Sequence, residues 1–129
     1  MIEVIQPSTV HDTRAYSYSH AVRMGGLIFV SGQVGRDRNG DLVGPGDVRL
    51  QTEQAFKNIK DILEAAGSGM HKVGKVTVLA TKVEFRPIIH EIRARVFKEV
   101  GYLPASTFSV VSSLALPEWL VEIEVIAEA

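Results

Sequence analysis

The C-terminal segment of the chain alternates between apolar and polar side chains. In "LVEIEVIAEA" (residues 120–129), the apolar side chains fall on one face of an extended strand, while Glu122 and Glu124 share the other face. On an edge strand, both carboxylates would face solvent. If both faces of the sheet are covered, at least one of them must pair, bind a ligand or line a cavity.

Two segments repeat apolar residues at helical spacing. The first helix is predicted from Asp47, a suitable N-cap, to Gly67, and the second over roughly 87–100, with Pro87 at its first position. Each carries one apolar stripe: Ala55, Phe56, Ile59, Ile62, Leu63 and Ala66 in the first, and Ile88, Ile89, Ile92, Val96 and Val100 in the second.

The other apolar segments have the spacing of strands. Residues 18–24 and 27–34 flank Gly25 and Gly26, which predicts a β-hairpin. Between the hairpin and the first helix, residues 37–48 are rich in Gly, Pro, Asp and Asn, which predicts an irregular loop of the kind that often carries function. Three more strands are predicted at 75–85, 107–113 and 120–128.

The predicted order is β-β-α-β-α-β-β, within one domain over residues 1–129. Right-handed crossovers place both helices on one face of a mixed sheet, which is an α+β fold. The other face then lacks a cover, although residues 27–30 and 75–83 are apolar on both faces. We therefore predict an oligomer whose sheets pack against one another.

Composition narrows the classes of function. Fourteen Lys and Arg residues against 15 Asp and Glu residues give a net charge of −1 without a basic block, so nucleic acid is not expected as a partner. No run of eighteen apolar residues is present, so no membrane association is expected, and no secretory signal is recognisable. The absence of cysteine excludes thiolate catalysis and fits a cytoplasmic protein.

Common catalytic motifs are missing. The four histidines, His11, His20, His71 and His90, have no metal-ligand spacing, and no phosphate-binding glycine loop is present, so neither a metal nor another cofactor is expected. Ser31 lacks the G-x-S-x-G context of a hydrolase nucleophile. Gly32 interrupts an apolar strand, which indicates either a β-bulge or a close ligand contact.

An ordered set of segments resembles the RidA family of imine deaminases, once described as translation inhibitors. The resemblance spans nearly the whole chain, through "YSHAV" (18–22), "VSGQVG" (30–35), "QTEQAFKNIKDILEAAG" (51–67), "KVTVLATKVEF" (75–85), "PAST" (104–107) and "LVEIEVIA" (120–127). It implies a chorismate-mutase-like fold in a homotrimer, with the sheets packed into a central barrel and small-molecule clefts between subunits.

The resemblance also implies a site. In typical members, water attacks the C=N carbon of a small imino acid, and ammonia and a 2-keto acid are released. The catalytic acid of the family falls on Glu122, while Tyr18, Ser31 and Gly32 match ligand contacts. Glu124 is then expected to make structural polar contacts.

One segment departs from the family. Deaminating members read P-A-R-S, in which the arginine binds the substrate carboxylate, whereas this chain has Ser106 at that place and Thr107 after it. A hydroxyl does not replace the two parallel hydrogen bonds of a guanidinium, so weak or no activity on ordinary 2-imino acids is expected.

Two residues of the second helix are candidates for the missing contact, namely Arg93 and His90. A cleft that accepts an uncharged or differently charged ligand is another interpretation, since Ser106 and Thr107 leave more room. For Arg93 and Arg95, the alternative is a solvated helix face on which Glu91 and Arg95 form an i,i+4 pair.

Two functions therefore remain. One is an enamine or imine deaminase in which Glu122 orients water and Tyr18, Ser31, Gly32 and Ser106 shape the pocket. The other is a homotrimer that binds or senses a small metabolite without turnover. Ribonuclease activity, attributed to some relatives, is disfavoured by the neutral charge.

Overall fold

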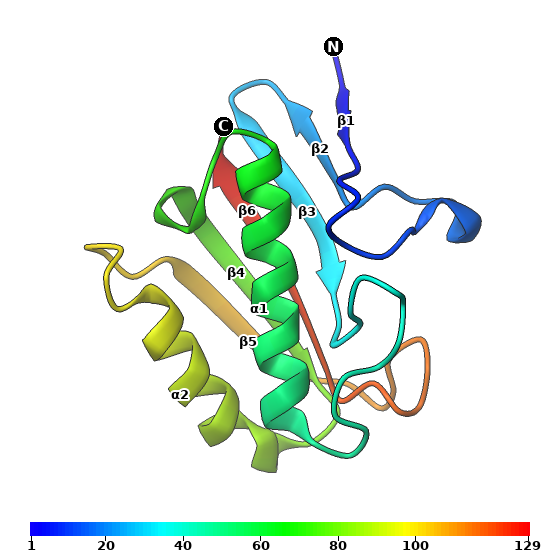
Figure 1. Ribbon diagram of the computed structural model, residues 1–129. Helices are drawn as coiled ribbons and strands as arrows, with labels where there is room; N and C mark the ends of the chain where they lie inside the picture. The colour runs from blue at the N-terminus through cyan, green and yellow to red at the C-terminus, as the bar shows by residue number, and fades with distance from the viewer.

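The computed structural model describes residues 1–129 and contains a six-stranded sheet in the order β1-β2-β3-β6-β4-β5 (Figure 1). All neighbouring strands are antiparallel except β4 and β5, which are parallel. The strands are β1 (Glu3–Ile5), β2 (Ala21–Met24), β3 (Leu27–Gln33), β4 (Val73–Ala80), β5 (Ala105–Val110) and β6 (Val121–Glu128). The helices are α1 (Val48–Ala65) and α2 (Arg86–Phe97), and the short 3₁₀ helices are η1 (Arg14–Tyr16), η2 (Met70–Lys72) and η3 (Val83–Phe85).

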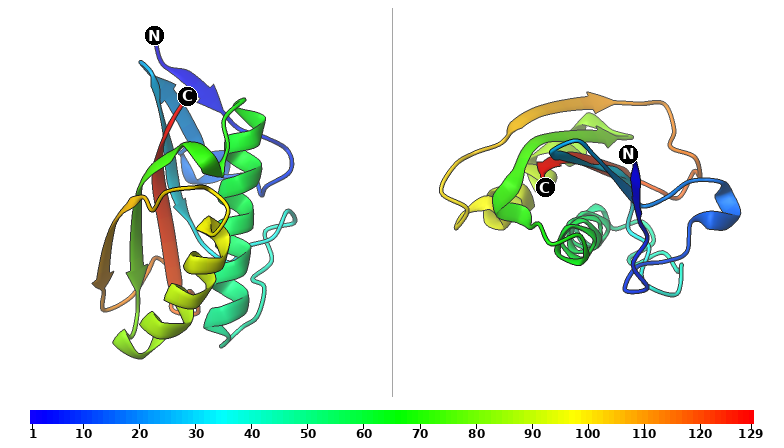
Figure 2. Two further views of the ribbon diagram at one scale, coloured as in Figure 1. Left: turned by 90° about the vertical axis from the view of Figure 1, so that its left-hand side faces the viewer. Right: turned by 90° about the horizontal axis from the view of Figure 1, so that it is seen from above.

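Both helices lie on one face of the sheet, as the views from the side and from above show (Figure 2). This arrangement confirms the predicted α+β class. The sheet differs from the prediction at the N-terminus, where residues 3–5 form the additional strand β1. Three residues are too few to give a periodic signal, and their pairing with β2 is a tertiary contact.

The predicted apolar stripes of the helices form the core. Asp47 caps α1, since its side chain accepts a hydrogen bond from the backbone N–H of Leu50 at 3.1 Å. Phe56 of α1 and Phe97 of α2 pack edge to face with their ring centroids 6.1 Å apart. Beneath the helices lie the apolar faces of the central strands, including the fully buried Val76, Val78, Val121 and Ile123. Burial of these side chains is the main source of stability.

The predicted ends of three elements are wrong. The strand predicted over 75–85 ends at Ala80 and is followed by η3, and the strand predicted over 107–113 lies at Ala105–Val110. Helix α2 ends at Phe97, before the predicted end near residue 100. Neither helix has the length and apolar composition needed to cross a membrane.

The face of the sheet opposite the helices has no cover from this chain (Figure 2). The polar side chains of β6, Glu122 and Glu124, lie on this face. They pair with Leu79 and Thr77 of β4, respectively. Farther toward the edge, Lys75 donates a hydrogen bond to Thr107 Oγ1 at 2.7 Å. The two glutamates therefore lie on the open face near the middle of the sheet.

Candidate functional site

A cavity of about 650 Å³ lies where the open face of the sheet meets two loops. Its floor consists of Ser31 and Gly32 from β3 and of Glu122 and Glu124 from β6. The remaining lining residues come from the N-terminal segment and from the two loops: Tyr16, Tyr18, Arg36, Gly40, Leu42, Ala115, Leu116, Glu118 and Trp119. The cavity therefore combines acidic, basic and apolar groups in one enclosure.

Gly32 lies directly beneath the carboxyl group of Glu122. The ladder between β3 and β6 shifts register between Val30 and Gln33, which is the β-bulge that the sequence offered as one interpretation of Gly32. A methyl group built on Gly32 would lie 2.6 Å from Cδ of Glu122, far inside van der Waals contact. Glycine is therefore needed here because any side chain would displace the carboxylate.

The Glu122 carboxyl group makes no hydrogen bond or ion pair within the chain, although it is partly buried. Burial raises its pKa, and the neighbouring negative charge of Glu124 raises it further. Glu124 is exposed and also makes no hydrogen bond, so the expectation of structural polar contacts for Glu124 is wrong. An unpaired carboxylate with a raised pKa in a cavity is suited to accepting and returning a proton.

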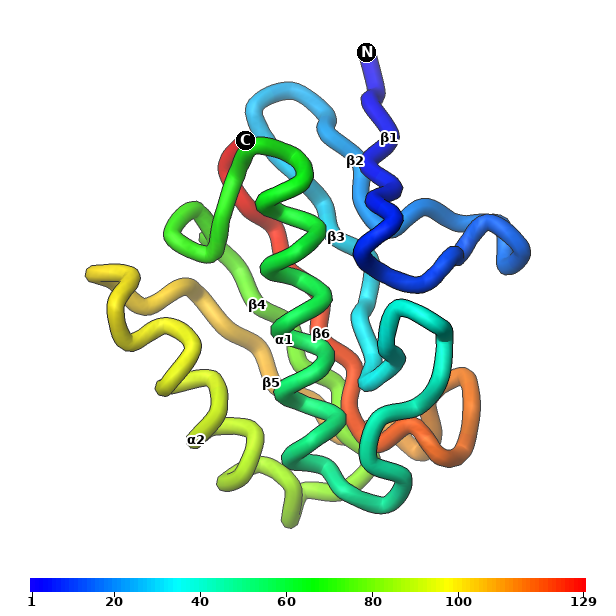
Figure 3. The backbone as a smooth tube through the Cα atoms, viewed as in Figure 1, coloured from blue at the N-terminus to red at the C-terminus, as the bar shows by residue number.

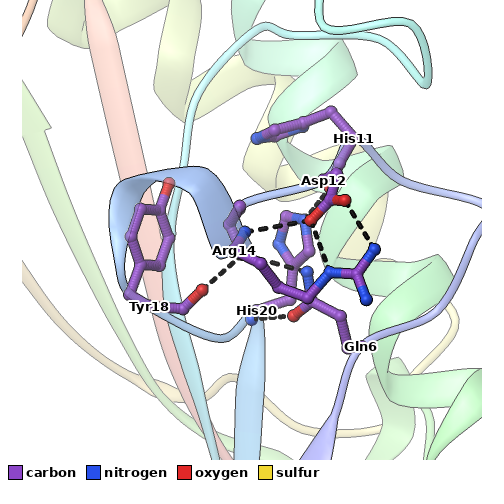
Figure 4. A network of polar contacts seen from close by, with 7 residues as sticks. Gln6, His11, Asp12, Arg14, Tyr18 and His20 are labelled. Atoms are coloured by element: carbon purple, nitrogen blue, oxygen red, sulfur yellow. Dashed lines mark hydrogen bonds and ion pairs between the residues drawn. The ribbon is translucent and has the colours of Figure 1, made fainter.

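The segment that carries Tyr18 is held by a polar network (Figure 4). Thr13 donates its hydroxyl hydrogen to the carbonyl oxygen of Tyr18 at 2.6 Å, and Gln6 donates to Thr13 Oγ1 at 3.0 Å. The same Gln6 amide accepts the backbone N–H of His20 at 2.8 Å. These contacts hold the backbone at Tyr18 and at His20, while the phenol of Tyr18 lines the cavity.

Two histidines behind this network are buried. His20 donates from Nε2 to the carbonyl oxygen of His11 at 2.5 Å, and its Nδ1 accepts from Gln33 Nε2 at 3.0 Å. The Nδ1 of His11 is buried without a partner. Burial and the nearby Arg36 and His20 lower the pKa of His11 to about 4. Both rings are therefore neutral in the folded protein at pH 7.

The buried His11 predicts a loss of stability in mild acid. Its pKa is lower in the folded chain than in the unfolded chain, so the unfolded chain takes up a proton first as the pH falls. The stabilisation is complete above about pH 6.5 and is lost toward pH 4, on the order of 3 kcal/mol. Urea unfolding between pH 7 and pH 4.5 should show this decline, and His11→Leu should flatten it. The exposed His90→Leu is the control, and an unchanged slope in His11→Leu would contradict this role.

Two loops that are distant in the sequence close the cavity. The segments around 36–47 and 111–120 run close together beyond the end of β3 (Figure 3). Gln51, fully buried in the first turns of α1, joins them by donating to the carbonyl oxygens of Gly44 at 3.2 Å and Glu118 at 3.3 Å. Its Oε1 also accepts the backbone N–H of Leu120 at 2.9 Å. Gln51 thereby positions Trp119 at the cavity.

The remaining predicted site residues lie elsewhere, at the β5 edge of the sheet. Ser106 is on β5, separated from β6 by β4, and its hydroxyl accepts a hydrogen bond from Arg93 Nη1 at 2.6 Å. Thr107 points to the other face of the same strand, toward Lys75. His90 is exposed on α2. Within one chain, His90, Arg93, Ser106 and Thr107 do not line the cavity that contains Glu122.

The predicted ion pair on α2 does not form. Glu91 instead accepts from Arg49 of α1 at 2.7 Å, and Arg95 lies 3.5 Å from Glu53 of α1. Both charges therefore connect the two helices, and Arg93 is left to contact Ser106.

Of the predicted site residues, Tyr18, Ser31, Gly32 and Glu122 line one cavity. It adds Arg36, Tyr16, Trp119 and Glu118, which the sequence interpretation missed. The sequence feature that could have indicated Arg36 is its position beside the loop predicted over residues 37–48. That loop contributes Gly40 and Leu42 to the lining of the cavity. Trp119 had no sequence signal, since its place depends on Gln51.

No group of three or more His, Cys, Asp or Glu side chains is close enough to hold a metal ion. The side chains that line the cavity offer acid-base chemistry and hydrogen bonding. Fold and site together define a small α+β protein with a glutamate-bearing cavity on the open face of its sheet.

Comparisons with known proteins place the chain in a family. The sequence profile described as Endoribonuclease L-PSP matches residues 11–129. The chain therefore belongs to this family, which is that of the RidA and YjgF proteins.

Individual relatives agree with this assignment. The 2-iminobutanoate/2-iminopropanoate deaminase of Mus musculus is 40% identical over 111 residues, which cover 85% of this chain and 79% of the mouse protein. The crystal structure of the Rid-family protein YyfA from Yersinia pestis is similar with a TM-score of 0.91 at 33% identity, over 100% of both chains. RidA from the Antarctic bacterium Psychrobacter is similar with a TM-score of 0.89 at 32% identity, over 98% of this chain and 99% of that one.

Proposed function

We propose that the chain is a hydrolytic deaminase of a small enamine or imine, with Glu122 orienting the attacking water. The observation that carries this proposal is the unpaired Glu122 carboxyl group, placed over Gly32 in a cavity large enough for a small metabolite. The similarity to a mouse 2-iminobutanoate/2-iminopropanoate deaminase supports this class of reaction.

The reaction follows from the groups around the cavity. Glu122 accepts a proton from water as the water oxygen adds to the carbon of the C=N bond, and the proton passes to the nitrogen. The C–N bond then breaks, the water oxygen becomes the carbonyl oxygen, and both protons of the water leave on ammonia. An enamine enters the same route after it tautomerises to the imine.

Ser31 and Tyr18 have complementary roles in this proposal. The Ser31 hydroxyl donates to the carbonyl oxygen of Ser19 at 2.6 Å, so its remaining lone pairs can accept an N–H of the substrate or of the leaving amine. Burial raises the pKa of Tyr18, so its phenol stays protonated at neutral pH and can donate a hydrogen bond.

We further propose that the active form is a homotrimer. The uncovered sheet face supports an oligomer, and the family resemblance implies a trimer with clefts between subunits. In such an assembly, the β5 edge of a neighbouring copy, with His90, Arg93, Ser106 and Thr107, would approach the cavity. The ligand would then lie in an intersubunit cleft.

The test is the release of ammonia and of the carbonyl product from freshly generated imines, both acidic and neutral. We expect turnover of at least one of them above the spontaneous rate. Stabilisation of the protein by a carbonyl product without turnover of any imine would instead support a trimer that binds a metabolite without catalysis.

Glu124 should contribute to the pH dependence of catalysis. The pKa of Glu122 is raised by burial and then by Glu124, so the carboxylate form is lost at a higher pH than for an ordinary glutamate. Glu124→Gln removes one of these causes and should move the acidic limb of the kcat/KM profile to lower pH. Glu128→Gln, farther along the same face of β6, is the matched control. An acidic limb at the same pH in Glu124→Gln and in the wild type would contradict this role.

A further inference from the structure

We infer that Arg36 binds the carboxylate of an acidic imine in the Glu122 cavity and so replaces the arginine that the family resemblance implies at Ser106. This inference rests on the proposed function, which it deepens by naming the residue that selects acidic substrates. It also reverses the expectation that the change at Ser106 leaves weak or no activity on ordinary 2-imino acids.

The guanidinium of Arg36 is already held in place. Its Nε donates to the carbonyl oxygen of Gly40 at 3.0 Å. Its central carbon lies 5.6 Å from the ring centroid of Tyr16 and 5.9 Å from that of Trp119. Binding a ligand would therefore immobilise little additional side-chain freedom.

The same guanidinium has no carboxylate partner. Arg36 forms no ion pair, and its two terminal nitrogens donate no hydrogen bond within the chain. The adjacent Asp37 forms no ion pair with Arg36, and its Oδ1 accepts the backbone N–H groups of Asn39 at 2.9 Å and Asp41 at 3.0 Å. The two terminal nitrogens are thus free to form the paired hydrogen bonds that a carboxylate favours.

Arg36, Tyr18 and Glu122 line the same cavity. Burial is the largest cause of the raised pKa of Tyr18. The charge of Arg36 lowers this pKa and the charge of Glu122 raises it, so both charges act on the phenol. A cavity lined by both a cation and a carboxylate fits a substrate that carries an acid group beside an electrophilic C=N carbon.

Arg93 is the competing cation, and its contacts argue against it. It donates to Ser106 at the β5 edge, outside the cavity that holds Glu122. Arg36 reaches the cavity from the same chain as Glu122 and needs no second copy to do so.

The experiment compares an acidic and a neutral imine. An amino acid oxidase generates 2-iminobutanoate from L-2-aminobutanoate, and an amine oxidase generates the benzaldehyde imine from benzylamine. Ammonia release gives kcat/KM for the wild type, Arg36→Gln, Arg36→Lys, Arg93→Gln and Arg38→Gln. Arg38 is the matched control because it is an exposed arginine of the same loop that does not line the cavity.

We expect Arg36→Gln to lower kcat/KM for 2-iminobutanoate about 100-fold and to leave the neutral imine within about threefold of the wild type. Arg36→Lys should lower kcat/KM for 2-iminobutanoate about tenfold, because lysine keeps the positive charge but cannot form two parallel hydrogen bonds with a carboxylate. Arg38→Gln should match the wild type on both imines. The inference would be overturned if Arg36→Gln lowered kcat/KM equally for both imines or did not lower it at all. It would also be overturned if Arg93→Gln, and not Arg36→Gln, lowered kcat/KM for the acidic imine alone.

A binding measurement separates this inference from the proposed function. By calorimetry, 2-oxobutanoate should bind the wild type at least about tenfold more tightly than Arg36→Gln. If the wild type hydrolyses neither imine but shows this difference, the deaminase proposal fails and the Arg36 site stands. Equal affinity of the two proteins for 2-oxobutanoate would overturn the Arg36 site, whatever the turnover.

Discussion

Replacement of Glu122 by glutamine should lower the kcat of imine hydrolysis about 1000-fold, because the amide has nearly the same shape but does not accept the proton of the attacking water. The fold should be unaffected. Glu122 makes no hydrogen bond or ion pair, and the variant removes a partly buried charge that lies beside Glu124. At pH 7 the free energy of unfolding should stay the same or rise by up to about 1 kcal/mol.

Turnover and urea unfolding of the same samples check this prediction. Glu124→Gln is the matched control, since it makes the same chemical change two residues along the same face of the sheet. It should retain kcat at its optimum pH. Equal activity of Glu122→Gln and the wild type would remove Glu122 from the mechanism, and a large loss of stability would show a structural role instead.

Replacement of Gly32 by alanine should lower kcat/KM about 100-fold, because the new methyl group would occupy the space of the Glu122 carboxyl group. The built Cβ lies 2.6 Å from Cδ and 2.7 Å from Oε1 of Glu122. These atoms belong to the outer part of a side chain that can rotate away. The loss of stability should therefore be modest, about 1 to 2 kcal/mol.

Gly74→Ala is the control for the effect of a methyl group on a strand glycine. Gly74 lies on β4, and its built Cβ has no neighbour closer than the carbonyl oxygen of Ile126 at 3.9 Å. That variant should keep wild-type turnover and nearly wild-type stability. A Gly32→Ala protein with full activity would show that Glu122 works from a different position than the one over Gly32.

The local pattern of the sequence predicted much of the fold. The stripe from Ala55 to Ala66 and the cap at Asp47 involve residues within one helix, so their spacing alone identifies α1. The alternation in residues 120–128 likewise placed Glu122 and Glu124 on one face of β6. Strand β1 escaped prediction because its three residues are stable only through pairing with β2.

The candidate site was predicted only in part, for the same physical reason. Glu122 and Gly32 each had a sequence signal, but their contact depends on the register of β3 against β6. Glu91 and Arg95 have the spacing of an i,i+4 pair, yet both contact α1, because packing of the two helices brings other charges nearer.

The α+β class, the helical core stripes and the carboxylate face of the last strand could be predicted from the sequence alone, because these features depend on spacing within single elements. The position of Glu122 over Gly32 and the presence of Arg36 in the same cavity depend on tertiary packing. Those contacts join segments far apart in the chain through one buried glutamine, one β-bulge and two loops. Their geometry follows from the packing of the whole sheet against α1 and α2, which no local pattern encodes.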